Sequence, residues 1–122
     1  LWMEVDKHTM RHPRFPNVFG AGDCVGTPIG KTAASVKAQV PVATANMIEA
    51  IQQREMSASY NGYTSCPLIT GRGRGILVEF DYELNMVPSF PFISPYEEHW
   101  VPWVMKDRML HAAYNAMMRG RV

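Results

Sequence analysis

The sequence predicts an α/β chain, or α+β if it is a fragment, with a kinked helix, a small antiparallel sheet and C-terminal helices. Apolar residues recur at steps of three and four between residues 31 and 54, which is the spacing of an amphipathic helix. Two β-rich runs, 63–70 and 76–82, flank a turn that contains glycine and arginine. A chain of 122 residues can bury one usable core.

The first thirty residues are expected to form short strands joined by polar loops. Residues 1–5 are apolar enough for a strand, and Val18-Phe19 reads as a second, buried strand. Pro13 and Pro16 keep the connection before it out of a helix. The stretch 17–24 (NVFGAGDC) then ends the strand in glycines and one acidic residue, a pattern that brings bare backbone close to a polyol or phosphate chain.

A helix is predicted from Lys31 to about Arg54. Because proline lacks a donor and clashes with the carbonyl four residues earlier, Pro41 predicts a kink near residues 37–41 or two consecutive helices. The helix would have one apolar face, made of Ala33, Ala34, Val36, Val40, Ala43, Met47, Ile48 and Ile51.

The second half of the chain predicts a hairpin and then helix. The hairpin turns at 71–75, and Val78, Phe80 and Tyr82 share one face by period-two alternation. Residues 96–118 favour a helix with Pro102 in its first turn. Its tryptophans and methionines fit either ordinary core or an interfacial helix lying in a lipid headgroup region.

Composition excludes several classes of protein. A formal net charge of +1 with 19% charged residues gives no electrostatic argument for nucleic acid binding. Two cysteines are too few for a secreted disulfide scaffold, so they favour a reducing compartment or a redox role. No apolar run is long enough to span a bilayer, and no G-x-G-x-x-G follows a strand, so a pyrophosphate-binding fingerprint is missing.

Several segments together carry a resemblance to a known family. The segment 16–23 (PNVFGAGD) resembles the second flavin-contacting motif of flavoproteins with two dinucleotide-binding domains, the pyridine nucleotide-disulfide oxidoreductases. Within that family, 31–34 (KTAA), 60–68 (YNGYTSCPL) and 79–82 (EFDY) are similar to sulfide:quinone oxidoreductases. The resemblance extends from about residue 5 to 119 and implies the C-terminal part of an FAD-dependent flavoprotein.

The resemblance implies a partial FAD site. Gly22 and Asp23 would approach the cofactor, with the Asp23 carboxylate accepting hydrogen bonds from a ribityl hydroxyl. Lys31 and Thr32 would lie at a helix N-terminus beside the electron-rich pyrimidine edge of the flavin. From the residues alone, a helix cap or a turn is the alternative for Asp23, and a solvated residue is the alternative for Lys31.

Cys66 is the candidate catalytic residue. A lone cysteine is usually a small buried apolar residue, but Pro67 and small polar neighbours are unlike a plain core strand. The resemblance implies that Cys66 belongs to a redox pair near the flavin that exchanges sulfur and passes on two electrons. Its partner cysteine is not in this chain, and Cys24 is interpreted as structural.

The resemblance also implies a quinone site, with Lys31 and Lys106 as contacts, and a peripheral or monotopic association with a membrane surface. No metal site is expected. The predicted domains are 1–56, the end of the FAD-binding domain; 57–95, the sheet of a C-terminal layer; and 96–122, an amphipathic helix. Partners would be sulfide, quinone, the remaining N-terminal part of the flavoprotein and, by self-association, further copies.

The sequence thus predicts part of an enzyme that oxidises sulfide to protein-bound sulfane sulfur and reduces quinone through FAD, with the isolated chain inactive. A flavocytochrome-type sulfide dehydrogenase and a type II NADH dehydrogenase are the alternatives among enzymes. Cys66 argues against the second, because electron transfer from NADH to quinone needs no thiol. A non-catalytic interaction or membrane-docking module is the alternative outside enzymes.

Overall fold

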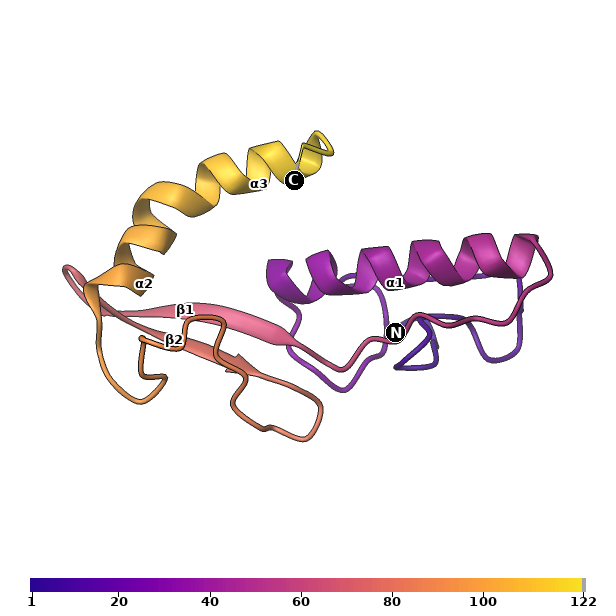
Figure 1. Ribbon diagram of the computed structural model, residues 1–122, viewed down its shortest axis with the longest axis horizontal. Coiled ribbons are helices and arrows are strands. Elements are labelled where there is room, and N and C mark those ends of the chain that lie inside the picture. Colours follow the sequence, from indigo (N-terminus) through magenta and orange to yellow (C-terminus); the bar gives the residue numbers. More distant parts are fainter. Residues whose placement is uncertain (122) are drawn as a thin grey trace. The chain divides into compact units, whose positions relative to one another are not determined.

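The computed structural model describes residues 1–121 and contains helices and one two-stranded sheet (Figure 1). Its residues form two compact units, the first made of Leu1–Ser65 and Phe80–Val87, and the second of Cys66–Glu79 and the residues from Pro88 onward. The elements in order are α1 (Ala33–Ile51), β1 (Thr64–Gly71), β2 (Arg74–Phe80), α2 (Trp100–Val104), the π-helical η1 (Met105–Met109) and α3 (Leu110–Met118). The α+β composition expected of a fragment is confirmed.

Helix α1 spans Ala33–Ile51, two residues later at its start and three residues earlier at its end than the predicted range from Lys31 to about Arg54. Thr32 is its N-cap, and the Thr32 hydroxyl accepts a hydrogen bond from the Ser35 backbone N–H at 3.1 Å. The prediction of two consecutive helices is wrong, because α1 is one unbroken helix with Pro41 inside it. Pro41 and Lys37 are both exposed, so water can satisfy the Lys37 carbonyl that loses its helical partner.

The buried face of α1 is largely polar, which corrects the apolar face predicted from spacing. Its buried residues are Ser35, Gln39, Ala43 and Asn46. Asn46 is fully buried, and its side-chain amide donates to the carbonyls of Thr9 and Ala58 at 3.0 and 2.9 Å and accepts from the Ala58 N–H at 3.1 Å. Loops whose backbone N–H and C=O groups have no partners in a sheet pack on this face. Polar side chains on α1 can hydrogen-bond to these groups, whereas apolar side chains cannot. Most of the predicted apolar face is exposed, including Val40, Met47, Ile48 and Ile51.

The expected strands near the N-terminus reduce to single bridges. Met3 pairs in parallel with Val25, and Arg11 pairs antiparallel with Phe19. A ladder would need several successive pairs; instead the chain turns between Arg11 and Phe19, where the Arg11 guanidinium donates to the Pro16 carbonyl at 3.0 Å. The apolar core of this unit is Met10, Val25, Ala43 and Tyr60.

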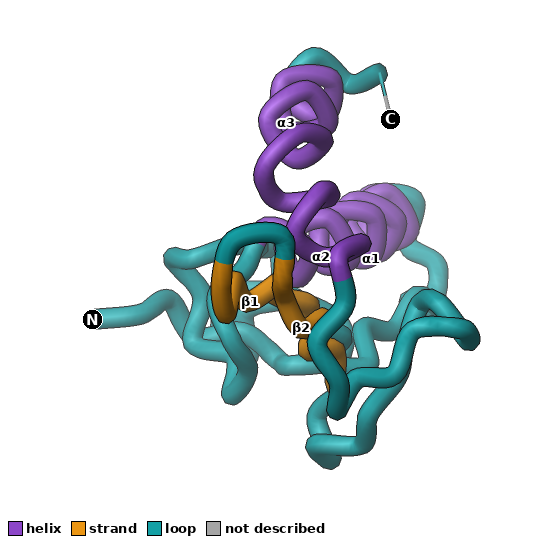
Figure 2. Tube along the Cα trace, turned by 90° about the vertical axis from the view of Figure 1, so that its left-hand side faces the viewer, coloured by secondary structure: helices purple, strands orange, loops and turns teal. Residues whose placement is uncertain are grey.

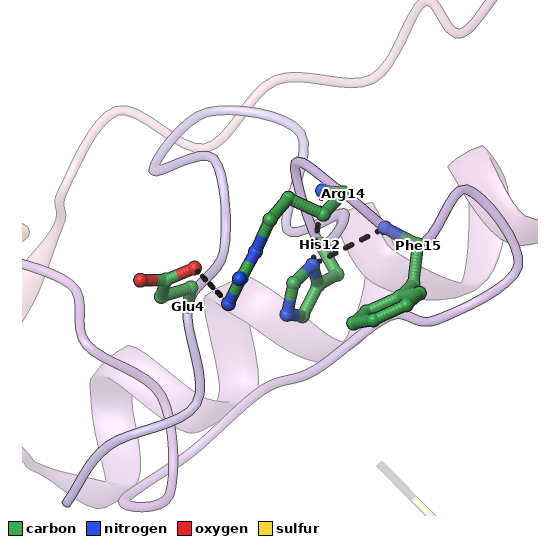
Figure 3. Close-up of polar contacts among 4 residues, drawn as sticks. All are labelled: Glu4, His12, Arg14 and Phe15. Atoms are coloured by element: carbon green, nitrogen blue, oxygen red, sulfur yellow. Dashed lines mark hydrogen bonds and ion pairs between the residues drawn. The ribbon is translucent and has the colours of Figure 1, made fainter.

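A histidine organises the turn before Phe19 (Figure 3). The His12 Nδ1 atom accepts hydrogen bonds from the backbone N–H groups of Arg14 and Phe15, at 3.1 and 3.3 Å. The Arg14 guanidinium forms an exposed ion pair with Glu4 at 3.0 Å. Because exposed ion pairs contribute little, the shared acceptor on His12 is the stronger constraint on this turn.

The predicted hairpin of β1 and β2 is formed, mostly within the second unit (Figure 2). Its turn is shorter than the predicted 71–75, because β1 ends at Gly71 and β2 begins at Arg74. The inward face of β2 carries Gly75, Leu77 and Glu79, whereas Val78 and Phe80 are only half-buried. Gly75 exchanges backbone hydrogen bonds of 2.9 and 2.8 Å with His99. A Cβ at Gly75 would lie 3.3 Å from the Trp103 backbone nitrogen, so the glycine allows α2 to approach β2 closely.

The C-terminal helical run begins at Trp100, with Pro102 buried in its first turn. It continues through η1 into α3, which has no buried residue in the described chain. Large apolar side chains are exposed along the run: Trp100, Met109, Leu110, Tyr114 and Met118. Charged Lys106, Asp107 and Arg108 fall within η1.

Gly62 provides a test of packing in the first unit. Its φ is +88°, and a Cβ there would clash with the Tyr82 ring and lie 2.6 Å from the Tyr82 backbone nitrogen. The Tyr82 hydroxyl is tied to the Lys7 carbonyl at 2.7 Å, so the ring cannot easily withdraw. We expect Gly62→Ala to lower the free energy of unfolding by about 3 kcal/mol, the sum of left-handed strain and overpacking.

Gly73→Ala is the matched control. Gly73 also has a positive φ, of +74°, but a Cβ there meets nothing within 4 Å. Its loss should therefore be about 1 kcal/mol, from backbone strain alone. Urea unfolding of both variants measures the difference, and equal losses would mean that the Tyr82 contact does not constrain Gly62.

Candidate functional site

All four predicted cofactor residues lie together at the N-terminal end of α1. Gly22, Asp23, Lys31 and Thr32 line one narrow depression, which has no room for a water molecule between its walls. Gly22 has a φ of +83°, which permits the tight turn before Asp23. The structure therefore brings the glycine-acid turn and the start of the helix to one place in the first unit.

The polar groups at this place fit part of an FAD molecule. The Asp23 side chain is exposed and has no hydrogen bond or ion pair with any described residue, so its carboxylate can accept from a polyol hydroxyl. The first amides of α1 have no intrahelical partner and carry the positive end of the helix dipole. The Asp23 carboxylate thus suits the hydroxyl groups of a ribityl chain, and the helix amides suit an electron-rich ring edge.

Lys31 is engaged within the chain. Its ammonium donates to the Val25 carbonyl at 2.6 Å and lies 4.1 Å from the centroid of the Trp2 ring. This hydrogen bond and cation–π contact fix the position of Lys31 at the depression. An ammonium has three donors, so a contact to a flavin or quinone oxygen stays a prediction.

Three residues that sequence reasoning missed hold this end of the helix. The Gln39 side-chain oxygen accepts from the Gly22 N–H at 2.7 Å. The Ser35 hydroxyl donates to the Gly30 carbonyl at 2.9 Å and also contacts the Thr64 hydroxyl at 2.9 Å. Ser35 and Gln39 are one helical turn apart, and this spacing could have predicted a polar face. No spacing in the sequence predicts the contact with Thr64.

Tyr60 is a buried residue next to Ser35 and Gln39 of α1. Its hydroxyl donates to the Tyr63 carbonyl at 2.7 Å. Burial raises the pKa of Tyr60 above its ordinary value, and hydrogen bonding with Ser35 and Gln39 offsets part of that rise. The phenol therefore stays protonated through the physiological range and acts as a hydrogen-bond donor.

Cys66 and Lys106 lie in the second unit. Cys66 is half-buried in β1 with a free thiol. The Lys106 ammonium donates to the carbonyl of Pro67, the residue after Cys66, at 2.8 Å. Lys106 is therefore placed beside the cysteine segment by η1. Cys24 is an exposed free thiol, whose sulfur donates to the Ala21 carbonyl at 3.3 Å.

A larger hollow of about 740 Å³ occurs elsewhere in the first unit, and it is lined by none of the predicted site residues. It lies beside Phe19 and the exposed apolar residues Met47 and Ile51 of α1. Among residues 1–121, no group of three or more histidine, cysteine, aspartate or glutamate side chains could hold a metal ion. Within the same residues, no helix has the length and apolar character needed to cross a membrane.

Comparison with curated proteins confirms the resemblance. No protein-family model matches the chain. It is 42% identical over 119 residues to mouse (Mus musculus) mitochondrial sulfide:quinone oxidoreductase, covering 98% of this chain and 26% of the relative. Identity is 45% over 101 residues with the Schizosaccharomyces pombe protein of that name, covering 83% and 22%, and 36% over 121 residues with the Dictyostelium discoideum one, covering 98% and 26%. The chain is thus homologous to sulfide:quinone oxidoreductases, and spans about a quarter of the length of these relatives.

A solved structure has the same fold. A chain in the cryo-EM structure of the Tetrahymena thermophila mitochondrial ATP synthase tetramer superposes with a TM-score of 0.85. The match covers 97% of this chain and 28% of that one, at 22% sequence identity. At that identity the likeness shows the fold alone.

The bond from Gly22 to Gln39 can be tested by mutation. Gln39→Leu keeps similar bulk but leaves the Gly22 N–H without its acceptor. Gln39 is 2% exposed, so water cannot easily replace the lost partner. We expect the free energy of unfolding in urea to fall by about 1–3 kcal/mol.

Gln52→Leu is the control for this change of side chain. Gln52 is an exposed residue at the C-terminal end of α1, so its substitution should change stability by less than about 0.5 kcal/mol. A Gln39→Leu variant as stable as Gln52→Leu would show that the Gly22 turn does not depend on this acceptor.

Proposed function

We propose that this chain is the C-terminal part of a flavoprotein that oxidises sulfide and reduces quinone. The observation that carries the proposal is 36–45% identity with three proteins named sulfide:quinone oxidoreductase, in two cases over 98% of this chain. In the reaction, sulfide loses two electrons and becomes protein-bound sulfane sulfur, and the electrons with two protons convert quinone to quinol. The chain spans about a quarter of its relatives, so we expect it to be inactive alone.

FAD, when bound, would supply the two-electron carrier between the substrates. Within this chain, Asp23 and the backbone at Gly22 would hold the ribityl chain. Thr32 and the first amides of α1 would face the pyrimidine edge. Lys31 would stand beside this edge, held by Val25 and Trp2. These donors are preorganised, because Gln39 and Ser35 fix the backbone on both sides of them.

Cys66 would be the catalytic thiol. It would carry sulfane sulfur and exchange it with a second cysteine in the rest of the protein. Its partial exposure leaves the sulfur within reach of a small anion such as hydrosulfide. The hydrogen bond from the Lys106 ammonium to the Pro67 carbonyl supports this role, because it holds the backbone next to Cys66. The remaining Lys106 donors would meet a quinone carbonyl, and Lys31 is the second candidate contact.

Exposed apolar side chains indicate which partners this chain would contact. The exposed apolar side chains Met47 and Ile51, at the rim of the hollow in the first unit, would pack against the remaining N-terminal part of the flavoprotein. The exposed side chains of α2 and α3 would contact a membrane surface as a peripheral element. Self-association through these faces is a further expectation. The predicted boundaries at 56 and 95 stay a prediction about the intact protein.

Three alternative functions are separated by simple observations. A related flavoprotein with another acceptor, such as a flavocytochrome-type sulfide dehydrogenase, would oxidise sulfide without reducing quinone. A type II NADH dehydrogenase would work without Cys66. A non-catalytic docking module would bind lipid or protein and leave the intact protein colourless, whereas a flavoprotein absorbs visible light.

The role of Cys66 gives the main test of the proposed function. In the intact protein, Cys66→Ser should reduce sulfide-dependent quinone reduction to background while flavin stays bound. A hydroxyl is far less acidic than a thiol and cannot carry sulfane sulfur. Quinone reduction followed by absorbance measures the rate, and the visible spectrum measures the flavin.

Cys24→Ser is the matched control, because it makes the same atomic change at an exposed thiol with one backbone contact. It should retain the parent's turnover. Unchanged turnover in Cys66→Ser would assign Cys66 a structural role and overturn the proposed chemistry.

The membrane contact is tested on the three most exposed apolar residues of the C-terminal run. Trp100, Met109 and Met118 are 67%, 58% and 69% exposed, whereas Trp103 packs near Gly75 and is left intact. Replacing the three with serine should release the intact protein from liposomes, because apolar burial drives interfacial binding. Activity with a water-soluble quinone should persist. Co-sedimentation with vesicles measures binding.

Leu84→Ser serves as the control, since Leu84 is 71% exposed in a turn of the first unit. It should leave liposome binding unchanged. If the triple variant co-sediments as well as Leu84→Ser does, the C-terminal run is not the membrane contact.

A further inference from the structure

A cluster of three hydroxyl groups lies buried at the N-terminal end of α1. The Thr32 hydroxyl is 3.0 Å from that of Ser35 and 3.0 Å from that of Thr64, and the Ser35 and Thr64 hydroxyls are 2.9 Å apart. We call Thr32, Ser35 and Thr64 the hydroxyl node. Ser35 and Thr64 are 2% and 3% exposed, and Thr32 is half-buried.

The node has three hydroxyl hydrogens for four contacts. The Ser35 hydroxyl has one hydrogen and two acceptors within reach, the Gly30 carbonyl and the Thr64 hydroxyl oxygen. The Ser35 backbone N–H donates to the Thr32 hydroxyl oxygen. The hydrogens of Thr32 and Thr64 are available for the contacts of Thr32 with Ser35 and Thr64. Each oxygen therefore has a partner, and removing the Thr64 hydroxyl takes away two of the four contacts.

The node contains residues at the start of two segments that the proposed function uses. Thr32 caps the helix whose first amides we propose to face the flavin. Thr64 is the first residue of β1, the strand that carries Cys66 two residues later. We infer that Thr64, through the hydroxyl node, is a positioning residue: it anchors the base of the cysteine strand to the helix end that would receive the flavin. This inference rests on the proposed function, because it assumes roles for Cys66 and the flavin.

A cap alone would not need Thr64. Thr32 already accepts the hydrogen bond that an N-cap provides, and Ser35 already has the Gly30 carbonyl as acceptor. The contacts of Thr64 span 32 and 29 residues of sequence. Their effect is therefore to hold Thr64, the first residue of β1, at the N-terminal end of α1, two residues before Cys66 in the chain.

The test uses Thr64→Val, which keeps the shape and removes the hydroxyl, in the intact flavoprotein with Cys24 replaced by serine. The rate at which iodoacetamide alkylates Cys66, read by peptide mass spectrometry, should rise about fivefold, the factor expected for one lost hydrogen bond. The rise should occur with and without bound flavin. The visible absorption maxima of the bound flavin should also shift. Thr64→Ser keeps the hydroxyl and should restore the parent's values.

Thr70→Val is the control, because it makes the same change at an exposed position of β1 and should have no effect. Ser35→Ala is a second variant, which removes a hydroxyl without adding bulk and should reproduce the effects of Thr64→Val. Alkylation rates and spectra of both variants equal to those of Thr70→Val would overturn the inference, as would failure of both to fold. Retained turnover in Cys66→Ser would instead reject the proposed function.

Discussion

The first unit depends on buried hydrogen bonds made by the side chains of one helix face. Gln39, Ser35 and Asn46 bind the backbone of the 22–23 turn, the Gly30 segment and the loops at Thr9 and Ala58. No strand of this unit extends beyond single bridges among residues 1–63, so a sheet does not supply these bonds. The cost of an unpaired buried amide or carbonyl makes the polar face a requirement for packing these loops against α1.

The same arrangement explains the geometry of the candidate site. The Gly22-Asp23 turn, the N-terminus of α1 and the start of β1 are separated in sequence but are held by residues within two turns of one helix. A site built in this way has little freedom, because each backbone segment has a directional bond to a fixed partner. The backbone at Gly22 and at Gly30 is therefore held in a fixed relation to the N-terminal end of α1.

Much of the fold was predictable from local signals. The position of α1 to within three residues, the pairing of β1 with β2, and Pro102 in a first turn follow from apolar spacing, alternation and proline chemistry. The grouping of Gly22, Asp23, Lys31 and Thr32 was implied by the family resemblance. The buried face of α1 was not predictable by apolar spacing, because the helix packs on loops whose needs are polar. Thr64 was missed since its partners lie about 30 residues away and only the fold brings them together.

The polar face of α1 also determines how the helix can be rotated about its own axis. An apolar face tolerates small rotations of a helix, because hydrophobic contacts have no preferred direction. Here a rotation of one residue, about 100°, would break the bonds of Ser35, Gln39 and Asn46 together and turn Val40 and Met47 toward backbone amides. The rotation of α1 about its axis is consequently fixed by the hydrogen bonds of three residues spread along its length. Substitutions elsewhere on the helix can change its outer surface freely without turning its N-terminal amides away from the depression.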